Sequence, residues 1–217
     1  MKSRLHVMLG FVIMALLVFL SFTTAAAQEM SGRFAVGAQI SYYDLDEDHI
    51  GEVDYEFDGA ALMGFNLSYF FTRNFVLQLS AEYTDTTLDT VSGPYKLEFG
   101  DFEQYPILLT GQYRFPTAFG TDFFVGVGVG YYINRFDLSD PYRRFYPSAE
   151  IDADDSFGYH LAGGFEVFVS ESWSLGAELR YVWNKADFTF RQPGSPEDSQ
   201  EIQLDGFIAG IGLKYYF

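Results

Sequence analysis

Seven ionisable residues stand inside segments that otherwise alternate between large apolar and small or polar side chains. Each has an apolar residue on either side, so its own side chain is expected on the enclosed face of a strand. Buried charges must pair. The set can act as a polar gate or proton-linked site, or as a structural plug, and we favour the plug because ion-pair networks perturb charges without serving chemistry. The members of this lumen polar network are Glu82, Arg114, His160, Glu166, Glu178, Arg180 and Lys214.

His160 is the candidate residue for nucleophilic catalysis. Eight-stranded barrels that deacylate lipid A carry a serine two residues after their histidine, whereas this chain has Ala162 there. The nucleophile is missing. His6 and His49 do not replace it, and the chain has no cysteine that could supply a thiolate. We therefore predict no catalytic residue and no enzyme.

An acidic stretch without Lys or Arg covers residues 44–58. Its aspartates at every second position from Asp44 begin like a calcium-binding loop. However, the glycine comes at Gly51, two places late, and the twelfth position is Tyr55. We interpret the stretch as a solvated acidic loop and predict no metal site and no cofactor. Loose binding of divalent ions, or bridging through such ions to anionic lipopolysaccharide, stays open.

Eight segments with a period of two position these residues. Rows of large apolar residues alternate with rows of Gly, Ser, Gln or charged residues, as expected for strands between lipid and a packed, polar lumen. A soluble calyx would instead turn its apolar row inward. We predict an all-β fold, an eight-stranded antiparallel up-and-down transmembrane β-barrel. Its strands are expected at about residues 33–43, 59–71, 75–83, 105–115, 123–133, 157–169, 173–183 and 207–217.

The connectors between these segments alternate in length, which predicts the orientation. Short links belong on the periplasmic side and long loops on the outside of the cell. Aromatic residues then fall into two belts at the strand ends, where the apolar band meets water. The short links are 72–74, 116–122 and 170–172, and the long loops are 44–58, 84–104, 134–155 and 184–203.

The N-terminus predicts the same compartment independently. Lys2 and Arg4 precede an apolar run, and Ala25 to Ala27 form a small-residue cleavage site, which is the layout of a secretory signal peptide. We expect residues 1–27 to be removed and residues 28–217 to form one outer-membrane barrel domain. The formal net charge of −17 excludes nucleic acid as a partner.

The C-terminal strand ends on an aromatic residue. Tyr215 and Phe217 share its outward row, and this ending resembles the assembly signal that outer-membrane barrels present to their insertion machinery. The expected partners are that barrel assembly machinery, outer-membrane lipid and lipopolysaccharide. The expected location is the bacterial outer membrane.

Four stretches together resemble the OmpW-type family of small eight-stranded outer-membrane proteins, namely residues 105–115, 124–131, 172–181 and 210–217. The resemblance implies a passive route for small hydrophobic molecules, which leave the lumen sideways between strands into the bilayer. The alternative is a structural or adhesive barrel, like OmpX or OmpA, that acts through its acidic extracellular loops.

Pro106 is the residue that the resemblance connects with a lateral opening. Proline lacks an N–H, so within a strand it removes one bond of the ladder. The family's loose wall also carries a proline before a Gln-Tyr-x-Phe stretch, which corresponds here to Gln112 through Phe115. A second interpretation also stays open, in which Pro106 lies just beyond the membrane band and simply limits the strand.

Overall fold

The structure is a computed structural model, and it describes residues 30–45, 48–50, 53–57, 59–92, 95–117, 119–139, 143–144, 150–191 and 198–217. The predicted signal peptide and its cleavage site lie outside this part of the chain. Within it, no helix is long and apolar enough to cross a membrane. The strands are β1 (Phe34–Leu45), β2 (Asp48–Ile50), β3 (Val53–Phe57), β4 (Ala60–Phe70), β5 (Phe75–Ser92), β6 (Tyr95–Pro116), β7 (Thr121–Leu138), β8 (Glu150–Ala153), β9 (Ser156–Phe168), β10 (Trp173–Arg191), β11 (Asp198–Gln203) and β12 (Gly206–Tyr216).

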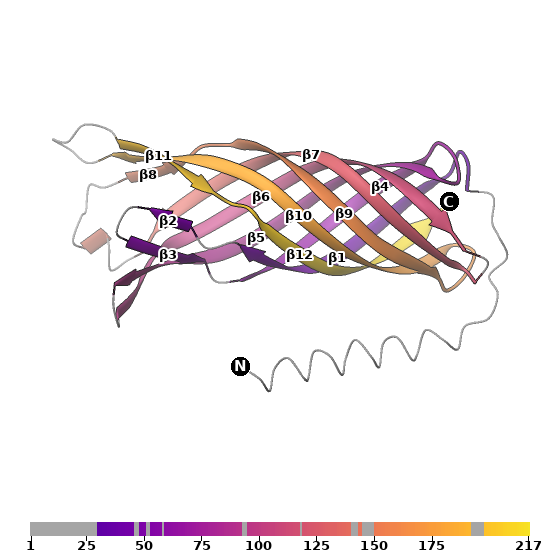
Figure 1. Cartoon of the computed structure of the whole chain (residues 1–217), viewed down its shortest axis with the longest axis horizontal. Helices are drawn as coiled ribbons and strands as arrows, with labels where there is room; N and C mark the ends of the chain where they lie inside the picture. The colour runs from indigo at the N-terminus through magenta and orange to yellow at the C-terminus, as the bar shows by residue number, and fades with distance from the viewer. Residues whose placement is uncertain are drawn as a thin grey trace.

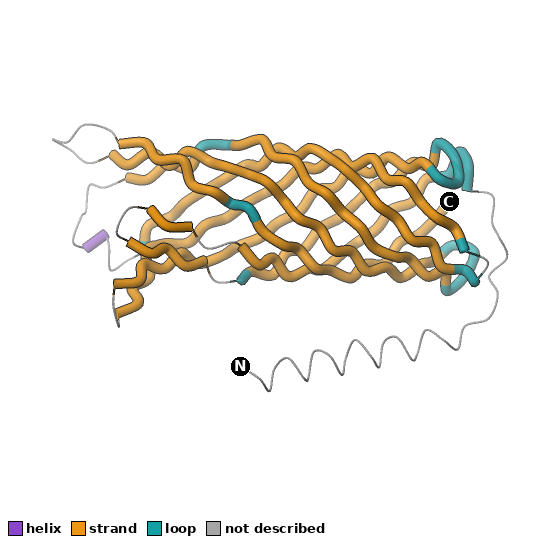
Figure 2. Tube along the Cα trace, in the orientation of Figure 1, coloured by secondary structure: helices purple, strands orange, loops and turns teal. Residues whose placement is uncertain are grey.

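Eight of these strands close into an antiparallel barrel, and Figures 1 and 2 show its shape from the side. Each pairs with the next in the order β1, β4, β5, β6, β7, β9, β10 and β12, and β12 pairs with β1. This architecture confirms the predicted fold class. A closed ladder leaves no strand edge unpaired within the membrane, which is what a spanning sheet requires.

The period of two sorts side chains between the outside and the lumen of the barrel as predicted. Phe65 on the outward row of β4 is 75% exposed, whereas Ser80 on the inward row of β5 is 2% exposed. The same alternation runs through β1, where Phe34, Val36 and Ile40 are exposed and Ala35 is buried. The exposed apolar row excludes the calyx, whose large apolar residues would fill the interior.

The predicted long loops are wrong in part, because strand continues into them. β5 runs to Ser92 and β6 begins at Tyr95, so residues 84–104 form mainly the end of a hairpin. The other three expected loops contain β2 and β3, β8, and β11. Residues 84–91 include four threonines, and β-branched residues favour strand even where the outward row has become polar.

The short turns lie together at one end of the barrel and the extended hairpins at the other (Figure 2). At the turn between β4 and β5, the hydroxyl oxygen of Thr72 accepts hydrogen bonds from the backbone N–H groups of Asn74 and Phe75. Gly120, in the turn before β7, adopts a φ of 72°, a conformation that a residue without a side chain adopts at little cost. Phe217 and Phe34 exchange two backbone hydrogen bonds and so join the last strand to the first at the short-turn end.

Candidate functional site

The base of the lumen holds a buried ion pair between Arg114 of β6 and Glu166 of β9. The carboxylate of Glu166 also accepts hydrogen bonds from Ser174 and Tyr216. Lys214 lies 3.7 Å from the same carboxylate, and Asp122 lies 3.8 Å from Arg114. These contacts link β6, β7, β9, β10 and β12 across the short-turn end of the barrel.

A second ion pair crosses the lumen higher up. Arg180 of β10 donates to both carboxylate oxygens of Glu82 on β5, at 2.8 and 3.0 Å. Gln39 of β1 donates to Glu82 at 2.8 Å. Glu178 lies 3.5 Å from Arg180. The predicted polar network thus forms two separate pairs instead of one continuous cluster.

His160 belongs to neither ion pair. Its Nε2 lies 2.9 Å from the hydroxyl of Thr110 on β6. The ring fills space that Gly128 leaves open, since a Cβ at Gly128 would come within 2.5 Å of it. Among the described residues, no cluster of three or more His, Cys, Asp or Glu side chains could hold a metal ion. The side chains of residues 46–58, which include most of the acidic stretch, lie outside the description.

A small cavity of about 40 Å³ lies between the two ion pairs. Glu166 and Lys214 line it from below, and Gln39 and Glu178 line it beside the upper pair. Its size suits one or a few water molecules. The lower lumen therefore holds the inward charges, although Phe70 and Tyr216 belong to a buried apolar cluster at its base, and the cavity does not reach Pro106.

Above the second ion pair, the lumen becomes apolar. A layer of buried side chains from six strands fills it, namely Tyr43, Leu62, Leu108, Tyr132, Val182 and Ile208. Beyond this layer, Gln104 donates to Asn134 at 3.0 Å and Ser156 donates to Asn184 at 2.9 Å, which ties β6 to β7 and β9 to β10.

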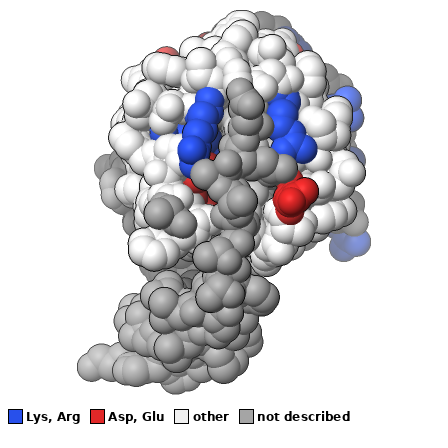
Figure 3. Space-filling model, turned by 90° about the vertical axis from the view of Figure 1, so that its right-hand side faces the viewer, with Lys and Arg blue, Asp and Glu red and all other residues white. Residues whose placement is uncertain are grey.

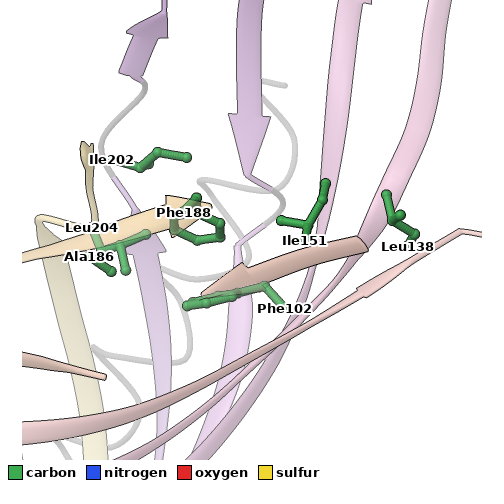
Figure 4. Close-up of a cluster of buried hydrophobic side chains, with 7 residues drawn as sticks. All are labelled: Phe102, Leu138, Ile151, Ala186, Phe188, Ile202 and Leu204. Carbon is green, nitrogen blue, oxygen red and sulfur yellow. The ribbon is translucent and has the colours of Figure 1, made fainter. Parts of the chain in front are cut away.

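A second apolar cluster fills the barrel at the end with the long hairpins (Figure 4). Its buried members are Phe102, Leu138, Ile151, Ala186, Phe188, Ile202 and Leu204. The rings of Phe102 and Phe188 are 5.8 Å apart. The upper lumen therefore presents apolar surface at two levels, in contrast to the charged base.

Pro106 lies within β6 with its side chain buried toward the lumen. Pairing with β7 continues through it, since Pro106 pairs with Tyr132. Pairing with β5 does not. Ala81 pairs with Ile107 and Thr84 with Gln104, in one register, but the ladder has no pairs for the two residues of each strand between them. A missing N–H accounts for a break beside a proline. Pro106 thus lies well inside β6, not at its end.

Side chains bridge this interrupted seam on both faces of the wall. Outside, the rings of Tyr83 and Tyr105 lie 5.1 Å apart across the missing pair. Inside, Glu82 lies opposite Pro106 in the register and is held by Arg180 from across the lumen. The Tyr83–Tyr105 contact therefore joins β5 to β6 where backbone bonds are absent, and Arg180 fixes the β5 side of the seam from within.

Tyr215 and Phe217 lie in the aromatic belt at the short-turn end. The ring of Phe217 stacks on Phe34 at 6.2 Å, and that of Tyr215 lies 4.9 Å from Trp173. Figure 3 looks onto this end and shows basic side chains around it. Arg33 immediately before β1 and Arg73 in the turn before β5 are both partly exposed there.

Sequence reasoning predicted the face of two further residues of the site but not their partners. Tyr132 was expected in the lumen beside the inward glycines of β7, and only the register shows that it lies opposite Pro106. Gln39 was expected inside the barrel, yet nothing in the sequence connects it with Glu82, because the contact spans two strand boundaries. Pairings across a lumen depend on the stagger of all eight strands, which period two alone does not specify.

A family model described as "Outer membrane protein beta-barrel domain" matches residues 13–217. The uncharacterized outer-membrane protein y4mB of Sinorhizobium fredii is 25% identical over 165 residues, which cover 76% of this chain and 69% of that protein. Outer membrane protein AlkL of Ectopseudomonas oleovorans is 23% identical over 192 residues, 84% of this chain and 77% of that protein.

Solved structures share the fold. The crystal structure of OprG from Pseudomonas aeruginosa superposes with a TM-score of 0.76 at 20% identity, and covers 87% of this chain and 97% of that one. The solid-state NMR structure of AlkL gives a TM-score of 0.62 at 21% identity, with 91% of this chain and 95% of that chain covered.

Proposed function

The chain belongs to the outer-membrane β-barrel family and is an integral protein of the bacterial outer membrane, and from this premise we propose that it is a passive route for small hydrophobic molecules. A solute enters from the outer end, meets the apolar upper lumen, and leaves sideways into the bilayer between β5 and β6 at Pro106. The observation that carries the proposal is the interrupted β5–β6 ladder.

The distribution of charge along the lumen supports a sideways exit over passage to the periplasm. Below the apolar layer, a solute meets Glu82 with Arg180 and then Arg114 with Glu166. Moving an apolar molecule past two buried ion pairs requires breaking them, and an unpaired buried charge is costly. Exit through the seam needs only the Tyr83 and Tyr105 rings to part, with little ladder bonding to break.

The similarity to small outer-membrane barrels and the OmpW-type resemblance agree with uptake of hydrophobic substrates. We also infer that the protein is not an enzyme. His160 contacts Thr110 within a packed lumen, with Ala162 at the position where a nucleophile would be needed.

A disulfide across the seam tests the exit directly, because the chain has no cysteine of its own. In the variant Tyr83→Cys with Tyr105→Cys, the two positions lie opposite each other in the register that the flanking pairs share, and the native rings are 5.1 Å apart. We expect uptake of octane by cells to fall when this bond forms and to recover when it is reduced.

The matched control is Tyr131→Cys with Phe157→Cys. These residues form another outward aromatic pair, with rings 4.9 Å apart, across the uninterrupted β7–β9 ladder. Oxidation of this pair should leave uptake unchanged. Equal loss in both double variants, or no loss in either, would show that the β5–β6 seam is not the exit.

The packed outer mouth favours a second candidate, a structural or adhesive barrel that acts through its outer hairpins. The apolar cluster around Phe102 and Phe188 fills the barrel where a solute would enter. On this reading, octane uptake would equal that of cells without the protein, whatever the state of the disulfide. The same uptake measurement therefore separates the two candidates.

A further inference from the structure

Eight buried side-chain polar atoms have no hydrogen-bond partner within the described part of the chain, and three of them come from adjacent strands. These three are the hydroxyl of Tyr132, Nδ1 of His160 and Nε of Arg180, and all three residues are at most 3% exposed. They come from β7, β9 and β10, which are neighbours in the barrel. Arg180 interacts electrostatically with both Tyr132 and His160. Buried polar groups without partners are rare and costly, so the grouping of Tyr132 and His160 around Arg180 points to a ligand group.

The chemistry of these atoms selects the ligand. Nε of Arg180 can only donate a hydrogen bond, and it lies 3.5 Å from Glu178 without forming one. The hydroxyl of Tyr132 can donate as well. An ammonium group has only donors and therefore cannot accept a hydrogen bond from Nε of Arg180. A carbonyl or ether oxygen can accept one.

The charge of the lumen excludes an acidic ligand group. Among the described inward residues, the acids Glu82, Asp122, Glu166 and Glu178 outnumber the bases Arg114, Arg180 and Lys214 by one. A carboxylate would add a second surplus negative charge at low dielectric, and this repulsion is strong there. The ligand group that fits is neutral and accepts hydrogen bonds.

The position of Tyr132 connects this group with the exit. Tyr132 pairs with Pro106 across the β6–β7 ladder, and its ring lies in the apolar layer beside Leu108 and Val182. A Cβ at Gly130 or Gly158 would come within 2.7 or 2.9 Å of the ring, so the two glycines provide the room it occupies. The hydroxyl is thereby held between an apolar layer and the charged pair.

We propose that Tyr132, with His160 and Arg180, forms a subsite for the uncharged, hydrogen-bond-accepting head of a medium-chain solute such as a ketone, whose tail lies in the apolar layer. This inference rests on the proposed function and narrows its substrate class. The solutes favoured at the exit are those with one neutral polar end, in preference to plain hydrocarbons.

Binding of 2-octanone and octane to the purified protein in lipid nanodiscs tests the subsite, with empty nanodiscs as the measure of partition into lipid. The test variant is Tyr132→Phe, which keeps the ring and removes the hydroxyl. The matched control is Tyr43→Phe, in the same apolar layer, because the hydroxyl of Tyr43 already donates to the carbonyl of Leu204 at 2.6 Å.

We expect Tyr132→Phe to lower the preference for 2-octanone over octane by about fivefold, the change that loss of one neutral hydrogen bond corresponds to. The carbonyl stretching band of bound 2-octanone should shift to lower frequency in the wild type and in Tyr43→Phe, and this shift should be lost in Tyr132→Phe. An unchanged preference in Tyr132→Phe, or an equal loss for both solutes, overturns the subsite.

Failure of the subsite and failure of the route give different results. If cells take up octane through the protein but the ketone shows no dependence on Tyr132, the route stands and the subsite is wrong. If uptake of octane equals that of cells without the protein while 2-octanone still binds through Tyr132, the subsite stands and the route is wrong.

Discussion

The β1–β12 seam and the β5–β6 seam close the same barrel by different means. Between β1 and β12, pairing is continuous from Ala35 with Tyr216 to Leu45 with Gly206. The same pairing of strands ends in two further backbone bonds between Phe34 and Phe217. Between β5 and β6, the ladder is broken beside Pro106. An aromatic pair joins the two strands outside, and inside an ion pair with Arg180 of β10 holds Glu82 of β5.

The difference lies in where each seam gets its stability. A continuous ladder is held by the backbone hydrogen bonds between its two strands and does not depend on side chains in the lumen. The seam at Pro106 depends on partners from elsewhere, since Glu82 is held by Arg180 of β10 and Gln39 of β1. A change in the lumen can therefore loosen the β5–β6 seam and leave the rest of the barrel closed.

The largest expected effect concerns the Glu82–Arg180 ion pair, which supports the β5–β6 seam from inside the lumen. Glu82→Ala should destabilise the barrel by about 3–5 kcal/mol, because it leaves the buried guanidinium of Arg180 without its main partner. Glu201→Ala, which breaks the exposed pair with Lys185, should cost no more than about 1 kcal/mol. Unfolding by urea in detergent, followed by gel mobility without heating, measures both. Equal effects would mean that the lumen does not support the seam.

The next effect concerns the β1–β12 seam and the assembly of the barrel. Phe217→Ser removes the ring that stacks on Phe34, at a cost of about 1.5–3 kcal/mol from lost apolar burial in lipid, and should lower the yield of assembled protein in the outer membrane. Phe119→Ser, in an exposed turn at the same end, should not lower the yield. Normal yield for Phe217→Ser would show that the terminal aromatic is no assembly signal.

Pro106→Val should make the β5–β6 ladder more continuous, like that of the β1–β12 seam. It restores an N–H and should add about 0.5–1.5 kcal/mol of stability if the β5–β6 ladder then closes. Uptake of octane should fall at the same time, and a misfolded variant could not show both changes. Pro116→Val, at the end of β6, is the control and should leave uptake unchanged. Uptake that persists in Pro106→Val would argue against lateral exit.

Much of the barrel could be predicted because one local rule governs it. Period two assigns Phe65 to the outside and Ser80 to the lumen without any knowledge of their partners, and closure follows from the need to satisfy every backbone group in lipid. The lengths of the hairpins could not be predicted in this way. Beyond the membrane the outward row turns polar, so the apolar pattern ends at Tyr83 while the ladder continues to Ser92.

The candidate site could be predicted by residue type but not by partner. The inward charges are visible in the sequence, yet which acid meets which base depends on the stagger of the strands, which separates an Arg114 pair from an Arg180 pair. Pro106 was identifiable because proline changes the backbone itself. The sequence did not show whether β5 or β7 loses a hydrogen bond there. That depends on which neighbouring strand the N–H of residue 106 would face.

The smallest expected effect is just outside the membrane, directly above the β5–β6 seam. Asp85 of β5 pairs with Glu103 of β6 in the register, so two carboxylates face each other across the strands. Partial desolvation, with the charges of Asp101 and Glu103, raises the pKa of Asp85. A raised pKa means that the folded protein binds this proton more tightly than the unfolded chain does. The ionised carboxylate therefore destabilises the fold once the pH exceeds that pKa.

Asp85→Asn should accordingly stabilise the barrel slightly near neutral pH, where the wild-type carboxylate is charged. The gain should shrink as the pH falls through the raised pKa of Asp85, and it should vanish below the ordinary aspartate pKa, where the wild type is itself neutral. Thermal transitions of both proteins across this pH range, read as gel mobility, measure it. A difference that persists at low pH would trace the effect to the shape of the side chain. The opposed charges would then be no part of what distinguishes the β5–β6 seam from the β1–β12 seam.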